Sequence, residues 1–153
     1  MNSETFIYLG SDHRGFNSKK LVIESFNNSV KYRIIDCGSF DGTTSADYPD
    51  YAKKVCSNVL QKKKEGKVAY GILICSSGIG MSMVANRYKN IRCALCSNTE
   101  QAKATREHNN SNVLALGCDY ITENMLKSIV NTFLKTKFTN EERHIRRILK
   151  INS

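Results

Sequence analysis

The segment VAYGILICSSGIGMS, residues 68–82, gives the clearest indication of the fold. Its first eight residues, ending at Cys75, are mostly aliphatic, aromatic or β-branched, which is typical of a buried strand. Small residues and two glycines follow, and over residues 80–88 the apolar side chains are spaced three and four apart, as on an amphipathic helix. A strand, a glycine turn and a helix in this order predict one unit of a parallel α/β sheet.

The same alternation runs along the rest of the chain. Short apolar segments bounded by Gly, Asp, Asn or Ser predict five strands, at residues 5–11, 31–36, 68–75, 91–97 and 112–116. Segments with helical spacing of apolar residues predict helices at 19–26, 50–64, 80–88, 100–107 and 122–134. Right-handed crossovers between parallel strands place helices on both faces of the sheet. We therefore expect an α/β protein, a Rossmann-like three-layer αβα sandwich with a five-stranded parallel sheet.

Three sequence signals mark helix starts. Pro49 lies near the first turn of one predicted helix, where proline is tolerated. Asn98 stands three residues before Gln101, and Thr139 stands three residues before Glu142; the second spacing fits a capping box. The second spacing predicts a further helix near the carboxyl terminus.

On that last helix, basic and apolar side chains separate into two opposite arcs: Arg143, Arg146, Arg147 and Lys150 against Ile145, Ile148 and Leu149. Arg143 and Arg147 are four residues apart, so both guanidinium groups can bind one phosphate. The alternative is an ordinary solvated basic face. The apolar arc must pack against something, and we expect this helix to pack on a partner subunit.

Length and composition limit the possibilities further. The chain has 153 residues, of which 41% are hydrophobic and 24% charged, which suits one folded domain over residues 1–153. The longest apolar run, residues 70–75, is far shorter than a membrane-spanning helix, and the amino terminus lacks the cationic start and long apolar core of a signal peptide. We expect a cytoplasmic protein without a membrane partner.

Neither the cysteines nor the net charge identifies the function of the protein. Six cysteines are spread singly through the chain, so reduced thiols are expected. Cys93 and Cys96 have C-x-x-C spacing, but residues three apart on a strand point to opposite faces, which argues against a zinc or redox site. The formal charge of +9 suits nucleic acid or a phosphorylated metabolite, or it simply aids solubility.

Ligands of open parallel sheets bind beyond the carboxyl ends of the strands. After the first predicted strand come Asp12, His13 and Arg14, which either belong to a polar site or serve as a helix cap and a solvated charge. The polar run at 106–112 contains His108 and is either part of a site or a connector with a structural cap.

The turn after the third predicted strand offers backbone N–H groups to an anion, although such glycine turns are often purely structural. Cys75 stands where a helix amino terminus favours a thiolate, which would make it a base or a nucleophile facing an oxyanion. The alternative is that Cys75 is a small buried hydrophobe. The turn matches neither G-x-G-x-x-G nor a Walker loop, so no nucleotide motif is present.

With these residues assembled, the chain closely resembles the RpiB/LacAB family of sugar-phosphate isomerases, and within it the type B ribose-5-phosphate isomerases. The resemblance follows the family's order over nearly the whole chain in GSDHRGF at 10–16, DYPDYA at 47–52, GILICSSGIGMS at 71–82, ANR at 85–87, HNNSNVLALG at 108–117 and RHIRR at 143–147. It implies an aldose-ketose isomerase of the pentose phosphate pathway, which interconverts ribose 5-phosphate and ribulose 5-phosphate through a cis-enediolate. It also implies that the reaction needs no metal or other cofactor.

The resemblance assigns catalytic roles as well. Cys75 matches the cysteine that moves the C2 proton in many members of the family. His108, with Asn109 beside it, matches the group that opens the furanose ring. The Ser77 hydroxyl and the backbone N–H groups of the turn would stabilise the enediolate oxygens, the turn residues being Ser76, Ser77, Gly78 and Gly80.

The implied binding residues hold the two ends of the substrate. Asp12 and Tyr48 would contact sugar hydroxyls. His13 would hold the phosphate together with Arg143 and Arg147, the two arginines coming from the other subunit. A homodimer is then the smallest active unit, and a tetramer is also compatible with the resemblance.

The chain departs from the family at one position. Members often have an arginine two residues after the glycine that closes the fifth strand, reaching towards the phosphate, whereas this chain has Asp119 after Gly117 and Cys118. An acid facing the site would repel a phosphate. Some members use an acidic base instead of cysteine, but the loop with Ile79 and Met81 offers no carboxylate.

Two other functions remain open. A related isomerase of a six-carbon sugar phosphate, of the galactose 6-phosphate or allose 6-phosphate type, shares many of these motifs; the cysteine together with the arginine pair favours the pentose. A non-catalytic protein that binds nucleic acid or another polyanion would use the +9 charge. Against it, the basic residues fall on several faces and no aromatic-studded basic strand or recognised motif is present.

Overall fold

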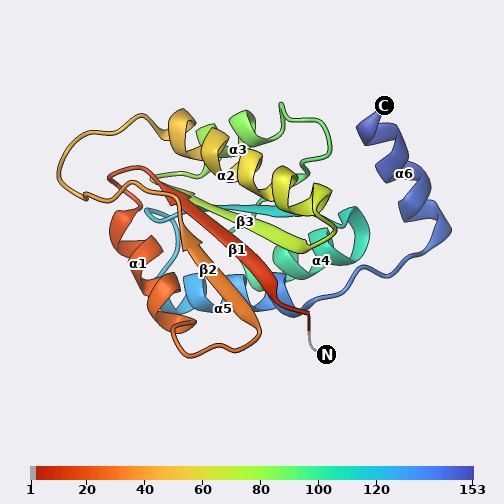
Figure 1. The fold of residues 1–153 in the computed structure, drawn as a ribbon, viewed down its shortest axis with the longest axis horizontal. Coiled ribbons are helices and arrows are strands. Elements are labelled where there is room, and N and C mark those ends of the chain that lie inside the picture. Colours follow the sequence, from red (N-terminus) through yellow and green to blue (C-terminus); the bar gives the residue numbers. More distant parts are fainter. Residues whose placement is uncertain (1–2) are drawn as a thin grey trace.

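A computed structural model of the protein describes residues 3–153. All five strands are parallel and form one sheet in the order β2-β1-β3-β5-β4 (Figure 1). Their bounds are Thr5–Ser11 for β1, Tyr32–Asp36 for β2, Val68–Cys75 for β3, Cys93–Leu95 for β4 and Val113–Gly117 for β5. The predicted parallel sheet is confirmed. Strand β4 is shorter than the predicted 91–97 because it lies at the edge and pairs with β5 alone over three residues.

Six helices accompany the sheet: α1 at Phe16–Ser25, α2 at Tyr48–Lys64, α3 at Ile79–Ala85, α4 at Thr99–Asn109, α5 at Glu123–Lys135 and α6 at Glu142–Asn152. Helices α2 and α3 cover one face of the sheet, and α1, α4 and α5 cover the other (Figure 1). The three-layer αβα architecture is therefore confirmed.

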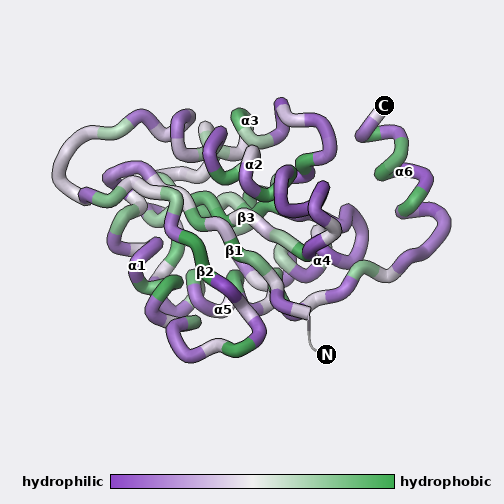
Figure 2. The backbone as a smooth tube through the Cα atoms, in the orientation of Figure 1, coloured by the Kyte–Doolittle hydropathy of each residue, from purple (hydrophilic) through white to green (hydrophobic). Residues whose placement is uncertain are grey.

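The two cores follow from the alternation of side chains along the strands. In β3, Ile72 and Ile74 pack towards α1, α4 and α5, whereas Leu73 and Cys75 pack towards α2 and α3. Both faces are covered, so the strands are apolar on both sides, and Figure 2 shows hydrophobic colour concentrated on the strands and hydrophilic colour on the outer helices.

The same alternation separates Cys93, the first residue of β4, from Cys96, which directly follows the strand. Cys93 contacts the core under α2 and α3, while Cys96 belongs to the opposite core. All six cysteines are free thiols. The prediction that Cys93 and Cys96 point to opposite faces is confirmed.

Two of the three predicted helix-start signals are confirmed and one is wrong. Pro49 lies in the first turn of α2, and the Asn98 side chain accepts a hydrogen bond from the Gln101 N–H at 2.8 Å, as predicted. The capping box at Thr139 is wrong. The Thr139 hydroxyl donates to the carbonyl oxygen of Glu107 at 3.0 Å, which draws this residue to the end of α4. Helix α6 therefore begins only at Glu142, without a side-chain cap.

Helix α6 lies outside the three layers, beside the end of α4 (Figure 1). His144 is its one buried residue, and Ile145, Leu149 and Ile151 are exposed. Of the apolar arc predicted for this helix, Ile148 is half-buried while Ile145 and Leu149 are exposed, so residues 3–153 cover the arc only in part. Its packing on a partner subunit stays a prediction. Within residues 3–153, no helix is long and apolar enough to cross a membrane.

Candidate active site

The turn after β1 packs directly against the end of β3 at the carboxyl edge of the sheet. Gly15 lies so close to the backbone carbonyl of Ile74 that a Cβ at position 15 would overlap it. The Asp12 carboxylate, which is buried, accepts a hydrogen bond from the Gly15 N–H at 3.0 Å and holds the turn in this shape. Asp12 therefore acts as a turn cap, and it lies beside the end of the strand that carries Cys75.

His13 is oriented by the loop before α2. Its Nδ1 accepts a hydrogen bond from the backbone N–H of Ala46 at 3.1 Å. Because Nδ1 is the acceptor, the proton of the neutral imidazole resides on Nε2. His13 thus offers an N–H donor to a ligand at this edge.

Cys75 is the last residue of β3 and is 5% exposed. Its Sγ accepts a hydrogen bond from the Gly78 N–H at 3.2 Å, which places a fixed donor against the sulfur atom. Gly78 has a φ of 76°, and a Cβ there would lie 2.9 Å from the backbone carbon of Leu116. Glycine is therefore required at this position, and its conformation aims the amide at Cys75.

The same turn also carries hydrogen-bond donors that could bind a ligand. The Ser77 hydroxyl oxygen accepts from the Ile79 N–H at 3.2 Å, which leaves its hydrogen free to donate. Within residues 3–153, the backbone N–H groups of Ser77 and Gly80 make no hydrogen bond. The Tyr48 ring covers Gly80 so closely that a Cβ there would lie 2.5 Å from the ring. The turn thus presents several donors beside Cys75 and beneath Tyr48.

Ser76 plays a different part from its neighbour. Its hydroxyl donates to the carboxylate of Asp119, so it can only accept a hydrogen bond from a ligand. The pKa of Asp119 is held below its usual value, first by this hydrogen bond and then by Arg14, whose Nη2 lies 3.2 Å from the carboxylate. Burial, with Asp119 nearby, raises the pKa of Cys118 to about 11.

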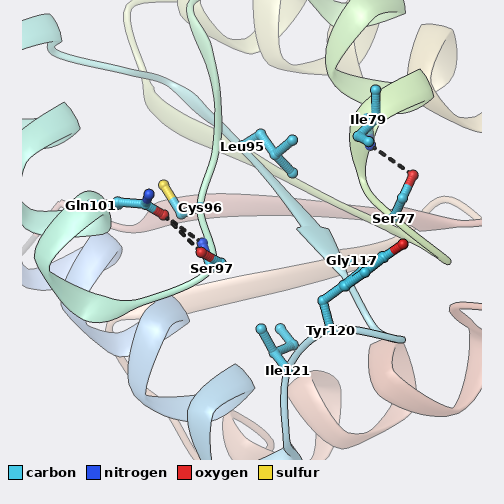
Figure 3. A pocket seen from close by; sticks show the side chains of 9 residues that line it. All are labelled: Ser77, Ile79, Leu95, Cys96, Ser97, Gln101, Gly117, Tyr120 and Ile121. Carbon is cyan, nitrogen blue, oxygen red and sulfur yellow. Dashed lines mark hydrogen bonds between the residues drawn. The ribbon is translucent and has the colours of Figure 1, made fainter.

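A pocket of about 330 Å³ opens beside this turn (Figure 3). It shares Ser77 with the candidate site but does not reach Cys75, and its other lining residues are Ile79, Leu95, Cys96, Ser97, Gln101, Gly117, Tyr120 and Ile121. The Gln101 side chain accepts from the Ser97 N–H at 2.7 Å and closes one wall. The sequence analysis missed this pocket because its lining comes from four separate segments.

The remaining predicted residues gather at the other end of the sheet. His108 and Asn109 end helix α4, and the Asn109 carbonyl accepts from the Arg92 side chain at 2.9 Å, just before β4 begins. The His108 ring stacks on His144 of α6, with ring centroids 4.6 Å apart. Burial, with His108 nearby, lowers the pKa of His144. Arg143 and Arg147 lie on the same helix.

Two groups of residues therefore result. The carboxyl-edge group is Asp12, His13, Tyr48, Cys75, Ser76, Ser77, Gly78 and Gly80, and the amino-edge group is His108, Asn109, Arg143 and Arg147. Gly71 of β3 pairs with Val113 at the start of β5, and Cys75 pairs with Gly117 at its end. These four residue steps alone span about 13 Å. One chain therefore does not bring Cys75 and His108 together.

Comparison with known proteins decides the class of the molecule. A model of the ribose/galactose isomerase family matches residues 7–151. The chain belongs to this family. Its fold is that of a ribose 5-phosphate isomerase from Thermotoga maritima, with a TM-score of 0.88 and 41% identity over 96% of this chain and 97% of the other.

Two further ribose-5-phosphate isomerases are similar to this chain. The structure of ribose-5-phosphate isomerase B from Mycoplasma genitalium with bound ribulose-5-phosphate matches with a TM-score of 0.89 and 37% identity, covering 98% of this chain and 95% of the other. Ribose-5-phosphate isomerase B of Mycobacterium leprae is 33% identical over 93% of this chain and 85% of its own length. The predicted family is confirmed, and the protein is an isomerase.

Proposed function

We propose that the protein interconverts ribose 5-phosphate and ribulose 5-phosphate in the cytoplasm, with residues 1–153 acting as one catalytic domain. The observation that supports this best is the arrangement around Cys75: a sulfur with a fixed N–H donor at 3.2 Å, adjoining a turn in which the Ser77 hydroxyl and the Ser77 and Gly80 amides donate no hydrogen bond within residues 3–153. The family member from Mycoplasma genitalium, which binds ribulose-5-phosphate, supports the choice of a pentose.

In this proposal Cys75 acts as the base. Its thiolate takes the proton from C2 of the open aldose, the electrons of that C–H bond form the C1–C2 double bond, and the carbonyl electron pair moves to O1, which gives a cis-enediolate. The Ser77 hydroxyl and the Ser77 and Gly80 amides stabilise the negative charge that develops on the enediolate oxygens. The thiol then returns the proton to C1, and the O2 proton passes to O1 as the C2=O bond forms, which gives the ketose and restores the thiolate. Each such donor contributes about 3 kcal/mol in comparable oxyanion chemistry.

Ring opening requires a second acid-base group, which we assign to His108 with Asn109 beside it. A group that transfers protons must lie within about 3 Å of the atoms concerned. The distance between the two edges of the sheet prevents His108 from reaching a sugar at Cys75 of its own chain. A symmetric dimer solves this, because each carboxyl-edge group then meets the amino-edge group of the partner subunit.

The exposed side of α6 supports such a dimer. Ile145, Leu149 and Ile151 are exposed in the single chain, and we propose that α6 packs on a second copy through them while its arginines extend to the second copy's site. Arg143 forms an ion pair with Glu141 at 2.9 Å, while Arg147 has no carboxylate partner within residues 3–153. We assign the phosphate to His13 of one subunit and to Arg143 and Arg147 of the other.

Asp12 and Tyr48 complete the proposed site by contacting sugar hydroxyls. Asp12 has one carboxylate oxygen engaged by Gly15, and its other oxygen is available as an acceptor. Tyr48 lies over Gly80, so its hydroxyl is placed above the turn that holds the reacting carbons.

The decisive experiment incubates the purified protein with ribose 5-phosphate in the presence of EDTA and follows ketose formation. We expect turnover that does not depend on added metal. The assay is then repeated with galactose 6-phosphate and allose 6-phosphate at equal concentrations. Faster turnover of a six-carbon substrate would contradict the pentose assignment, and loss of activity in EDTA would contradict the reaction without a metal. Within residues 3–153, no three His, Cys, Asp or Glu side chains are grouped so that they could hold a metal ion.

A further inference from the structure

Three loops at the carboxyl edge are joined by one carboxylate. Asp119, which follows β5, accepts the Ser76 hydroxyl from the loop after β3, and its Oδ2 lies 3.2 Å from Nη2 of Arg14 in the turn after β1. The backbone repeats the connection, because the Asp119 N–H donates to the Ser76 carbonyl at 3.0 Å. The Cys118 thiol donates to the Arg14 carbonyl at 3.4 Å. Asp119 thus lies next to the loop that begins at Cys75.

This arrangement changes how the acid at position 119 acts on an anion. The hydrogen bond from Ser76 and the charge of Arg14 hold the pKa of Asp119 low, so the carboxylate is ionised at neutral pH. Its negative charge is matched by the guanidinium 3.2 Å away. The side chains of Arg14 and Asp119 are 57% and 44% exposed, and ion pairs this open add little to folding stability.

The Arg14 guanidinium has N–H donors that could bind a ligand. A guanidinium carries five N–H groups, and only Nη2 of Arg14 is engaged within residues 3–153. The neighbouring His13 offers Nε2–H, because its Nδ1 accepts from Ala46. Two consecutive residues therefore present free donors at the rim of the carboxyl-edge group. A guanidinium held on one side by a carboxylate can bind phosphate oxygens with its other side.

We propose that Arg14 binds the phosphate of the substrate together with His13, and that Asp119 is the positioning residue that orients its guanidinium. This inference rests on the proposed function, since it names a further contact for the same sugar phosphate. It also gives Asp119 a favourable role, where the sequence alone suggests repulsion.

The first test compares the Arg14→Ala protein with the unchanged protein. Loss of a charge-assisted contact should raise KM for ribose 5-phosphate about tenfold or more, with a smaller effect on kcat. The dissociation constant of inorganic phosphate, measured by titration calorimetry, should rise in parallel. The matched control is Arg33→Ala, which removes an exposed arginine that pairs with Glu4 at 3.7 Å on the edge strand β2, and which should change neither quantity.

The second test asks whether removal of the Asp119 carboxylate raises or lowers KM. If Asp119 positions Arg14, Asp119→Ala raises KM severalfold, and adding this substitution to Arg14→Ala has no further effect. If Asp119 instead only repels the phosphate, Asp119→Ala lowers KM, and the inference is overturned. Arg14→Lys retains the charge without the planar fork, so it should recover part of the affinity.

The calorimetric readout separates the two proposals. Phosphate binding that weakens in Arg14→Ala supports the inference even if no pentose is turned over, which would count against the proposed function alone. Unchanged phosphate binding and unchanged KM in Arg14→Ala would overturn the inference while leaving the isomerase reaction intact. Thermal unfolding of each variant verifies that the substitutions, all at exposed side chains, leave the fold unchanged.

Discussion

The two edges of the sheet are built in opposite ways. At the carboxyl edge, glycines at 15, 78 and 80 leave no room for a side chain, and Cys75 already has its hydrogen-bond donor within the chain. At the amino edge, His108 and Asn109 are exposed, and His144 is the one buried residue of α6. The proposed proton-transfer group is thus preorganised by the fold of one chain. In the proposed dimer, the group assigned to ring opening and phosphate binding is completed only by assembly.

Complementation between two inactive variants tests most strongly whether the two edges meet across subunits. Cys75→Ala and His108→Ala should each lower kcat by about 10³-fold, since each removes an acid-base group. Mixed in equal amounts and allowed to exchange subunits, the two inactive proteins should recover about a quarter of normal activity, because half of the dimers are mixed and each mixed dimer has one intact site. Each variant incubated alone is the control. Absence of recovery in proven mixed dimers would mean that the two residues do not meet across subunits.

Removal of one donor sharpens the description of the carboxyl edge. Ser77→Ala should lower kcat for ribose 5-phosphate by about 10²-fold, because a hydroxyl free to donate to the enediolate oxygen is lost. Steady-state kinetics on the pure variant provides the measurement. Ser77→Thr keeps the hydroxyl and is the control. A variant with unchanged kcat would show that the turn does not stabilise the charge in this way.

The amino edge can be tested through its bare apolar arc. Leu149→Glu should weaken the dimer at least tenfold, because a carboxylate would be buried in an apolar contact. The dissociation constant can be measured by analytical ultracentrifugation, and activity should fall with dilution. Lys150→Glu adds the same carboxylate on the basic side of α6 and serves as the control. Equal dimer stability in both variants would argue against α6 as the interface.

The smallest expected effect concerns Cys118, which lies in the same loop as Asp119. Its pKa is raised to about 11 by burial and by the nearby carboxylate, so the thiol is protonated at pH 8. Only roughly one molecule in a thousand then carries the reactive thiolate. Iodoacetamide at pH 8, followed by peptide mass spectrometry, should leave Cys118 nearly unlabelled, and labelling should increase as the pH rises towards 11. Rapid labelling at pH 8 would contradict this environment.

Much of the fold was predictable because local pattern and burial agree. Strand β3 keeps its predicted bounds since both faces are covered and its apolar run is uninterrupted. Strand β4 was predicted too long because an edge strand ends where its single neighbour ends, which the apolar run does not reveal. Thr139 was misread as a cap because its hydroxyl bonds to Glu107, which lies 32 residues away.

The carboxyl-edge group was predictable for a similar reason, since turns at strand ends are local features. The pairing of Arg14 with Asp119 was not, because 105 residues separate them and only the order of the strands brings the two turns together. The place of His108 carried a usable signal. It precedes a strand, so it had to lie at the amino edge, away from Cys75.

The order of the strands also has a consequence during synthesis on the ribosome. Strand β5 is inserted between β3 and β4, so β4 has no neighbour and one side of β3 is unpaired until residue 117 has emerged. At 5–20 residues per second, synthesis from the end of β3 to residue 117 takes about 2 to 8 s. During that time the apolar edge of β3 is open to other nascent chains, and a product truncated before residue 113 would keep that edge permanently. Released chains that end within α4 should therefore aggregate, whereas released chains that end within α6 should not.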